Sequence, residues 1–132
     1  MDKYSKMLDE MNDAVKAALA EDKKHRVYYS AYTTDSDGNP INNLNEVVIK
    51  GKVILTQSHD EFWGDGESYQ SAIIENPTWL ELAVLANDMI EMTGDHHHIF
   101  LENVYPVKVA GINTYEPKVV DGVRFYEFCM GS

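Results

Sequence analysis

The chain has 132 residues, of which 44% are hydrophobic and 25% charged, the composition of one globular domain rather than of a disordered segment. Its 22 acidic and 11 basic residues give a net charge of −11, which argues against nucleic acid as a partner, because phosphate binding relies on Lys and Arg. No apolar run is long enough to cross a membrane, and the N-terminal residues have no signal-peptide pattern. A single cysteine, Cys129, excludes an internal disulfide and favours a reducing, cytoplasmic location.

The acidic charge is concentrated in the middle of the chain. No Lys or Arg occurs between Lys52 and Lys108, whereas ten acidic residues and four of the five histidines lie there. The segments on either side are nearly balanced in charge. We therefore expect a basic protein or a cationic ligand to bind through this middle segment.

The N-terminal residues predict an amphipathic helix of about twenty residues, which Asp2 is placed to cap. Its apolar side chains recur at the spacing of one helix face: Tyr4, Met7, Leu8, Met11, Val15, Ala18 and Leu19. Such a face packs either on the sheet of this chain or on a second copy of the protein, as in a homodimer.

Three strands are predicted next. Residues 26–34 are rich in tyrosine and β-branched side chains, which favour strands. Residues 35–40 (DSDGNP) have the composition of a turn, and residues 46–57 alternate between apolar and polar side chains around Gly51, which suggests a bulge. Residues 68–75 form the third strand, after an acidic loop at residues 58–67.

A second helix is predicted from two alternative starts. Either Asn76 caps it with Pro77 in the first turn, or Thr78 and Glu81 form a capping box. Gly94 is a suitable end. Because this helix is apolar on almost every side, we expect it to be buried.

A strand at residues 96–104, with a short continuation at residues 107–110, and a final strand at residues 123–130 complete the order α-β-β-β-α-β-β. The connections between neighbouring strands are short, which favours antiparallel pairing. We therefore expect a single α+β domain over residues 1–132, in which a curved antiparallel sheet of about five strands packs on the buried helix.

The histidine run is the strongest chemical candidate. On a strand, His96 and His98 point to the same face about 6.6 Å apart, close enough to share a divalent metal. With Glu102 they form H-x-H-x3-E, a spacing that resembles the metal-binding motif of cupins over seven residues. That resemblance implies a divalent metal held by His96, His98 and Glu102, and His59 is a candidate fourth ligand. The alternative is that the histidines begin an exposed edge strand or line a subunit contact.

The acidic loop is the candidate surface for binding a partner. Aromatic anchors with a charged rim are common in protein interfaces, and this loop combines both in Asp60, Glu61, Phe62, Trp63, Asp65 and Glu67. Alternatively, the two aromatic residues fold back as a lid over the core. Gly64 and Gly66 are expected to leave the loop free to move.

Two functions of different classes follow. The first is a small acidic interaction module, such as an accessory protein or inhibitor from a virus or mobile element that acts on a basic host partner. The second is a metal-binding or small-ligand-binding enzyme whose sheet and central helix enclose a pocket beside His96 and His98. The absence of a nucleophile or phosphate-binding motif favours the first.

Overall fold

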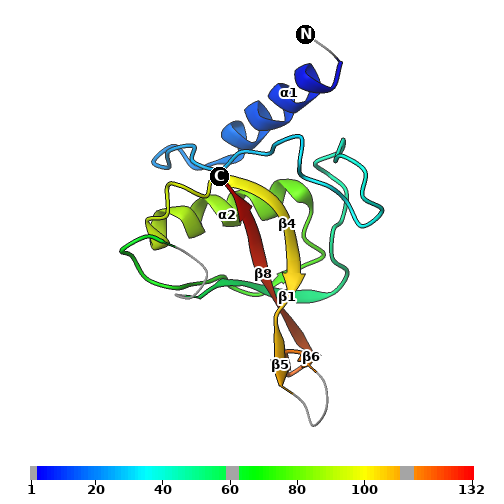
Figure 1. The fold of residues 1–132 in the computed structure, drawn as a ribbon, viewed down its shortest axis with the longest axis vertical. Coiled ribbons are helices and arrows are strands. Elements are labelled where there is room, and N and C mark those ends of the chain that lie inside the picture. Colours follow the sequence, from blue (N-terminus) through cyan, green and yellow to red (C-terminus); the bar gives the residue numbers. More distant parts are fainter. Residues whose placement is uncertain (1–2, 59–62, 111–114) are drawn as a thin grey trace.

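The computed structural model describes residues 3–58, 63–110 and 115–132. This part of the chain contains two helices and eight strands: α1 (Lys3–Ala18), β1 (Lys52–Gln57), β2 (Tyr69–Gln70), β3 (Ile74–Glu75), α2 (Trp79–Thr93), β4 (Phe100–Pro106), β5 (Lys108–Ala110), β6 (Tyr115–Pro117), β7 (Val119–Val120) and β8 (Val123–Gly131). Helix α2 lies at the centre of the body, with α1 near one end and β4 and β8 crossing in front of it (Figure 1). The α+β class expected from the sequence is confirmed.

The main sheet joins six of the described strands and is mixed rather than antiparallel. Its order is β2-β1-β8-β4, with β3 on β1 and β7 on β8. Strands β1 and β8 run parallel, with Val53 beside Arg124, whereas the other pairs are antiparallel. The prediction of a purely antiparallel sheet is wrong for β1 and β8, because the long connection through α2 and β4 lets the chain return in the same direction.

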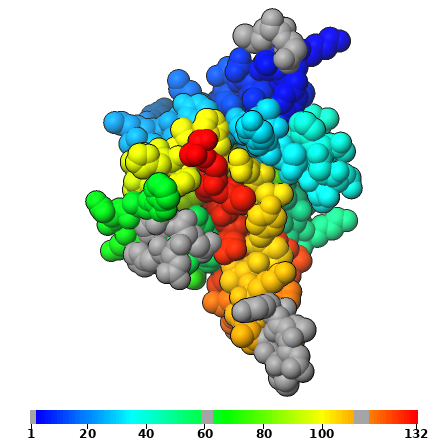
Figure 2. Space-filling model, in the orientation of Figure 1, coloured from blue at the N-terminus to red at the C-terminus, as the bar shows by residue number. Residues whose placement is uncertain are grey.

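A second, two-stranded sheet forms an arm. Strands β5 and β6 pair antiparallel and project from the lower end of the body, away from α1 (Figures 1 and 2). All three residues of β5 are exposed, so this strand adds little to the core.

Helix α1 is shorter than predicted and packs on its own chain. It spans 16 residues and buries Met11 and Val15, whereas Ala18, expected on the same face, is exposed. The partly buried Met7 and Leu8 pack against the same core. Helix α1 therefore packs against α2 of its own chain rather than against the sheet as predicted, and packing on a second copy stays a prediction.

Helix α2 begins and ends where the local signals place it. Thr78 is the N-cap, and its side chain and that of Glu81 form the capping box, so the start at Asn76 is wrong. Gly94 ends the helix in the left-handed conformation, with φ of 73° and its N–H bound to the carbonyl of Ile90. No helix in the described residues is both long and apolar enough to cross a membrane.

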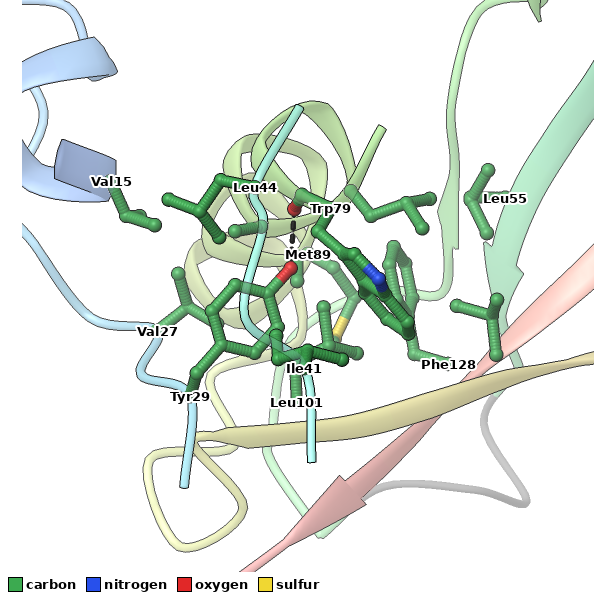
Figure 3. Packing of buried hydrophobic residues seen from close by; sticks show 14 of the residues in the cluster. Val15, Val27, Tyr29, Ile41, Leu44, Leu55, Trp79, Met89, Leu101 and Phe128 are labelled. Atoms are coloured by element: carbon green, nitrogen blue, oxygen red, sulfur yellow. Dashed lines mark hydrogen bonds between the residues drawn. The ribbon is translucent and has the colours of Figure 1, made fainter. Parts of the chain in front are cut away.

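The core surrounds α2, which buries Trp79, Leu82, Met89 and Ile90 almost completely, whereas Met92 in its last turn is 47% exposed (Figure 3). Trp79 packs edge-on against Tyr29 at 6.0 Å between ring centroids, and the Tyr29 hydroxyl donates a hydrogen bond to the Trp79 carbonyl. Burying one such side chain contributes about 1.5–3 kcal/mol. Other residues of this core come from all parts of the chain: Val15, Val27, Ile41, Leu44, Leu55, Met89, Leu101 and Phe128.

The strand predicted at residues 26–34 is not formed. The segment turns at Ala31 and Tyr32, where the Thr33 N–H donates to the Ser30 carbonyl at 3.1 Å, and before this turn Val27 and Tyr29 are buried as a strand would bury them. It pairs with the sheet only at Tyr28, whose N–H donates to the Ile99 carbonyl at 2.9 Å and whose carbonyl accepts from the Leu101 N–H at 2.9 Å. High strand propensity therefore produced no strand here, because the backbone has no continuous strand partner and turns at Ala31.

Two side-chain amides replace that missing partner. The Asn12 side chain on α1 binds both the N–H and the carbonyl of Tyr29, at 2.8 and 3.1 Å. Asn87 on α2, 0% exposed, accepts from the N–H groups of Arg26 and Val27 at 2.6 and 3.0 Å. Its Nδ2 donates to the Lys24 carbonyl at 2.9 Å. These bonds satisfy backbone groups whose burial without a partner would be costly.

Strands predicted elsewhere are shorter in the structure. Residues 46–50 lie outside β1, and only one bridge, between Val47 and Thr78, continues the pairing there. The segment predicted at residues 68–75 is interrupted between β2 and β3. The turn predicted at residues 35–40 is observed, closed by a bridge between Thr34 and Pro40.

Asn87→Ala is expected to lower the free energy of unfolding by about 3 kcal/mol, because one buried and two partly buried backbone groups lose their partner. Urea denaturation followed by circular dichroism measures the change. Asn42→Ala, at an exposed residue, is the matched control and should change stability little. Equal stability of the two variants would contradict the role given to Asn87.

Candidate functional site

The two predicted sites meet at the C-terminal end of α2. Four of their residues, His59, Asp60, Glu61 and Phe62, lie outside the described residues. Six are described: Trp63, Asp65, Glu67, His96, His98 and Glu102. We call the surface formed by Trp63, Asp65, Glu67, His97 and His98 the Trp63 surface.

The segment from Trp63 to Glu67 caps the helix. The N–H of Gly66 donates to the Thr93 carbonyl at 2.9 Å, and the N–H of Glu67 donates to the Met92 carbonyl at 3.0 Å. Carbonyls in the last turn of a helix have no partner within the helix. The loop supplies these partners, so its backbone is held against α2.

Gly64 and Gly66 are required for this contact. A Cβ atom on Gly64 would lie 1.9 Å from the Thr93 carbonyl oxygen, and one on Gly66 would lie 2.0 Å from that of Met92. Such distances are far below van der Waals contact, so a side chain would force the loop away. The expectation that these glycines leave the loop free to move is wrong, because they allow the loop to approach the helix.

The Asp95 side chain connects the loop at residues 63–67 to the histidines at residues 96–98 through hydrogen bonds. This carboxylate is 4% exposed and accepts hydrogen bonds from the Trp63 N–H at 3.1 Å, the His97 N–H at 3.1 Å and His98 Nδ1 at 2.8 Å. Burial on its own raises the pKa of Asp95. The bonds from Trp63, His98 and His97 together outweigh burial, so the pKa lies below its ordinary value.

Trp63 is the most conspicuous side chain of the surface. It is 78% exposed, and its ring meets the His98 ring edge-on at 5.0 Å between centroids and the His97 ring at 6.5 Å. Asp65 and Glu67 on the same loop are also exposed. For Trp63 the exposure supports a recognition surface rather than a lid.

The histidines are not on a strand. His96 and His97 form a turn between α2 and β4, and β4 begins only at Phe100. The strand placement is wrong because Asp95 accepts from the His97 N–H and closes a turn directly after the helix. His96 and His98 therefore do not have the strand geometry on which the cupin-like metal site was predicted.

The proposed metal ligands are not gathered in the described part of the chain. No group of three or more His, Cys, Asp or Glu side chains there is arranged to hold a metal. Glu102 lies on β4, where its carboxylate packs beside Gly131. His59 is outside the described residues, so a divalent metal that includes it stays a prediction.

Several of the acidic residues have structural partners that sequence reasoning missed. Glu91 receives a bond from Arg26 at 2.5 Å, which lowers the pKa of that carboxyl group, and Asp88 lies 3.7 Å from Lys23. Exposed pairs of this kind contribute about 0–1 kcal/mol each. Lys23 and Arg26 therefore neutralise part of the negative charge between Lys52 and Lys108.

No family model matches the chain, and no characterised protein or solved structure shows significant similarity to it. The function is therefore argued from the chemistry of its surfaces.

Asp95 connects the two predicted sites, and sequence reasoning missed it. Its position directly after Gly94, the predicted end of a helix, is the signal that could have found it, because Asp at such a position commonly binds nearby backbone N–H groups.

Gly64→Ala is expected to lower the free energy of unfolding by about 2 kcal/mol, because the added methyl group overlaps the Thr93 carbonyl. Amide hydrogen exchange should also become faster at Gly66 and Glu67, whose N–H groups cap α2. The exposed neighbour Ser68, changed to Ala, is the control. Unchanged exchange in Gly64→Ala would contradict the close approach.

Asp95→Asn is expected to destabilise the protein at pH 7 and to have less effect in acid. Because the folded pKa lies below the unfolded value of about 3.9, the carboxylate stabilises the fold above that pH. This contribution is lost as the pH falls through the folded pKa. Urea denaturation should therefore show the same stability difference between wild type and variant at pH 7 and pH 5, and a smaller difference at pH 3. A difference independent of pH would contradict it.

Proposed function

We propose that this domain is a protein-interaction module that binds a basic partner protein through the Trp63 surface. The observation that supports it most is the 78% exposure of Trp63 on a backbone held against α2. Tryptophan is enriched among the residues that dominate binding energy at protein interfaces.

The fixed backbone supports the same conclusion. Asp95 holds the N–H of Trp63, and the end of α2 holds those of Gly66 and Glu67. A surface ordered before binding loses less conformational entropy when the partner arrives. The loop backbone is therefore ordered before a partner binds.

Charge supports the choice of a basic partner. Asp65 and Glu67 lie on either side of Gly66, next to an exposed aromatic ring, in a chain of net charge −11. Two further acids, Asp60 and Glu61, belong to the same stretch of sequence. Such a charge distribution accelerates encounter with a positively charged protein and disfavours nucleic acid.

We extend the proposal to the biological setting. An accessory protein or inhibitor from a virus or mobile element, acting in the cytoplasm on a basic host protein, would need little more than this small acidic surface. The support for this setting is the chain's size, its charge and its single cysteine. A homodimer belongs to the same proposal and is measured by light scattering of the purified protein.

The test combines Trp63→Ala with Asp65→Lys and Glu67→Lys in immobilised protein. Wild-type protein should retain a basic partner from host extract and release it as salt is raised, because salt screens exposed charges. The triple variant should bind that partner at least about thirtyfold more weakly, since loss of a tryptophan anchor typically costs 2 kcal/mol or more.

The control carries Asp9→Lys and Glu10→Lys on the exposed face of α1. It makes the same change in charge as the two lysine substitutions in the loop. Equal loss of binding in the control and the triple variant would mean that net charge alone attracts the partner, and would refute the Trp63 surface as its site.

A further inference from the structure

Within the Trp63 surface, the rings of Trp63 and His98 lie at right angles to each other. Their planes form an angle of 90°, and their centroids are 5.0 Å apart. We call these two rings the Trp63–His98 pair. Trp63 is 78% exposed, and an indole with both faces covered would not keep so large an exposed fraction. The pair therefore presents an open aromatic face beside an imidazole ring.

One atom of Asp95 positions both members of the pair. Its Oδ2 accepts the backbone N–H of Trp63 at 3.1 Å and Nδ1 of His98 at 2.8 Å. Asp95 itself is 4% exposed, and its Oδ1 accepts the His97 N–H at 3.1 Å, so the carboxylate is held from both sides. The relative placement of the two rings is thereby ordered before a ligand arrives, which lowers the entropic cost of binding.

The same hydrogen bonds determine which nitrogen of His98 carries the proton. Asp95 receives donors on both oxygens, which favours its ionised form, and an ionised carboxylate can only accept. The bond at Nδ1 therefore places the proton of the neutral His98 ring on Nδ1. Nε2 then carries a lone pair, and no hydrogen bond among the described residues occupies it. The His98 side chain is 26% exposed, so the ring is partly open to solvent.

The side chains that follow Trp63 in the loop are acceptors too. Asp65 and Glu67 are exposed carboxylates. Two residues span at most about 7 Å of chain, so the Asp65 backbone lies close to that of Trp63. No Lys or Arg occurs in the sequence between Lys52 and Lys108. The surface therefore favours a ligand that brings positive charge and hydrogen-bond donors to an aromatic face.

A guanidinium group meets these requirements better than an ammonium group does. It is planar, carries five N–H donors and no acceptor, and stacks on aromatic faces. An ammonium group is compact and more strongly hydrated, so it gains less from contact with a flat ring. A cation interacts with an aromatic ring when it lies within about 6 Å of the centroid, and the His98 ring is 5.0 Å from that of Trp63. A guanidinium that stacks next to His98 can therefore contact both rings.

We propose that the Trp63–His98 pair is an arginine-binding site. The guanidinium group of an arginine on the partner protein stacks on the Trp63 indole and donates a hydrogen bond to Nε2 of His98, and the charges of Asp65 and Glu67 attract it. This inference rests on the proposed function, since it names the side chain by which the basic partner is recognised.

The probe is the blocked peptide acetyl-Gly-Arg-Gly-amide, compared with the same peptide carrying lysine or citrulline in place of arginine. Lysine keeps the charge without the planar group, and citrulline keeps the planar group without the charge. The chain has two tryptophans, so its nitrogen–proton spectrum has two indole signals, and Trp63→Phe assigns them. The arginine peptide should shift the Trp63 indole signal and the Nε2 signal of His98. It should bind at least about threefold more tightly than either comparison peptide, as expected for stacking at an exposed ring.

Two variants separate the contributions of the pair. Trp63→Leu keeps an apolar side chain but removes the aromatic face, and it should bind the arginine and lysine peptides equally. His98→Phe keeps a ring but removes Nε2, and it should bind the arginine peptide about threefold more weakly, as expected for loss of one hydrogen bond. Tyr32→Leu, at an aromatic residue that is 80% exposed and lies outside the Trp63 surface, is the matched control. It should bind as wild type does.

Three results would overturn the arginine site. The first is equal affinity of wild type for the arginine and lysine peptides, which would mean that charge alone is recognised. The second is absence of shifts at Trp63 and His98 with the arginine peptide, and the third is equal weakening in Trp63→Leu and Tyr32→Leu. The proposed function is tested separately, by the retention of a basic partner on wild-type protein and its loss in the triple variant. Any of the three peptide results would leave that test standing.

Discussion

The burial of Asn87 in the middle of α2 is the constraint on which the rest of the fold depends. A helix apolar on almost every side must be covered on every side, and here one side is covered by irregular chain rather than by a strand. Irregular chain carries backbone groups that need partners when buried. The Asn87 amide supplies three of them and holds residues 24–27 on the helix, and Asn12 does the same for Tyr29 from α1. The Tyr29 hydroxyl, placed by this arrangement, binds the first carbonyl of α2 (Figure 3).

The same requirement explains why other segments of the chain lie against both ends of α2. Helix ends expose backbone groups that other segments must satisfy. At the C-terminal end the loop at residues 63–67 meets this need, and at the N-terminal end the N–H of Trp79 reaches the Glu46 carbonyl. Each supporting segment is thereby fixed by its backbone while its side chains remain available to a partner. Rigid elements that position functional loops in this way are common in proteins.

The parts of this fold that the sequence predicts are those with local signals. The bounds of α2 follow from Thr78, Glu81 and Gly94, which act on the chain within one turn. The strand predicted at residues 26–34 is wrong because strand propensity does not indicate which groups will pair with the backbone. Here those groups are mostly the side chains of Asn12 and Asn87, which are distant in sequence. The parallel pairing of β1 with β8 depends on a crossover of the whole second half of the chain, which no local pattern encodes. At the candidate site, exposed Trp63 agrees with the predicted anchor, whereas the glycines beside it were misjudged because their contact is with the helix.

The acidic residues that give the net charge fall into two groups, those with partners inside the molecule and those that are exposed. Lys23 and Arg26 lie against Asp88 and Glu91, Glu81 belongs to a cap, and Asp95 is buried among donors. The acids left exposed at the Trp63 surface are Asp65 and Glu67, and they stand beside the C-terminal end of α2, where the helix dipole adds partial negative charge.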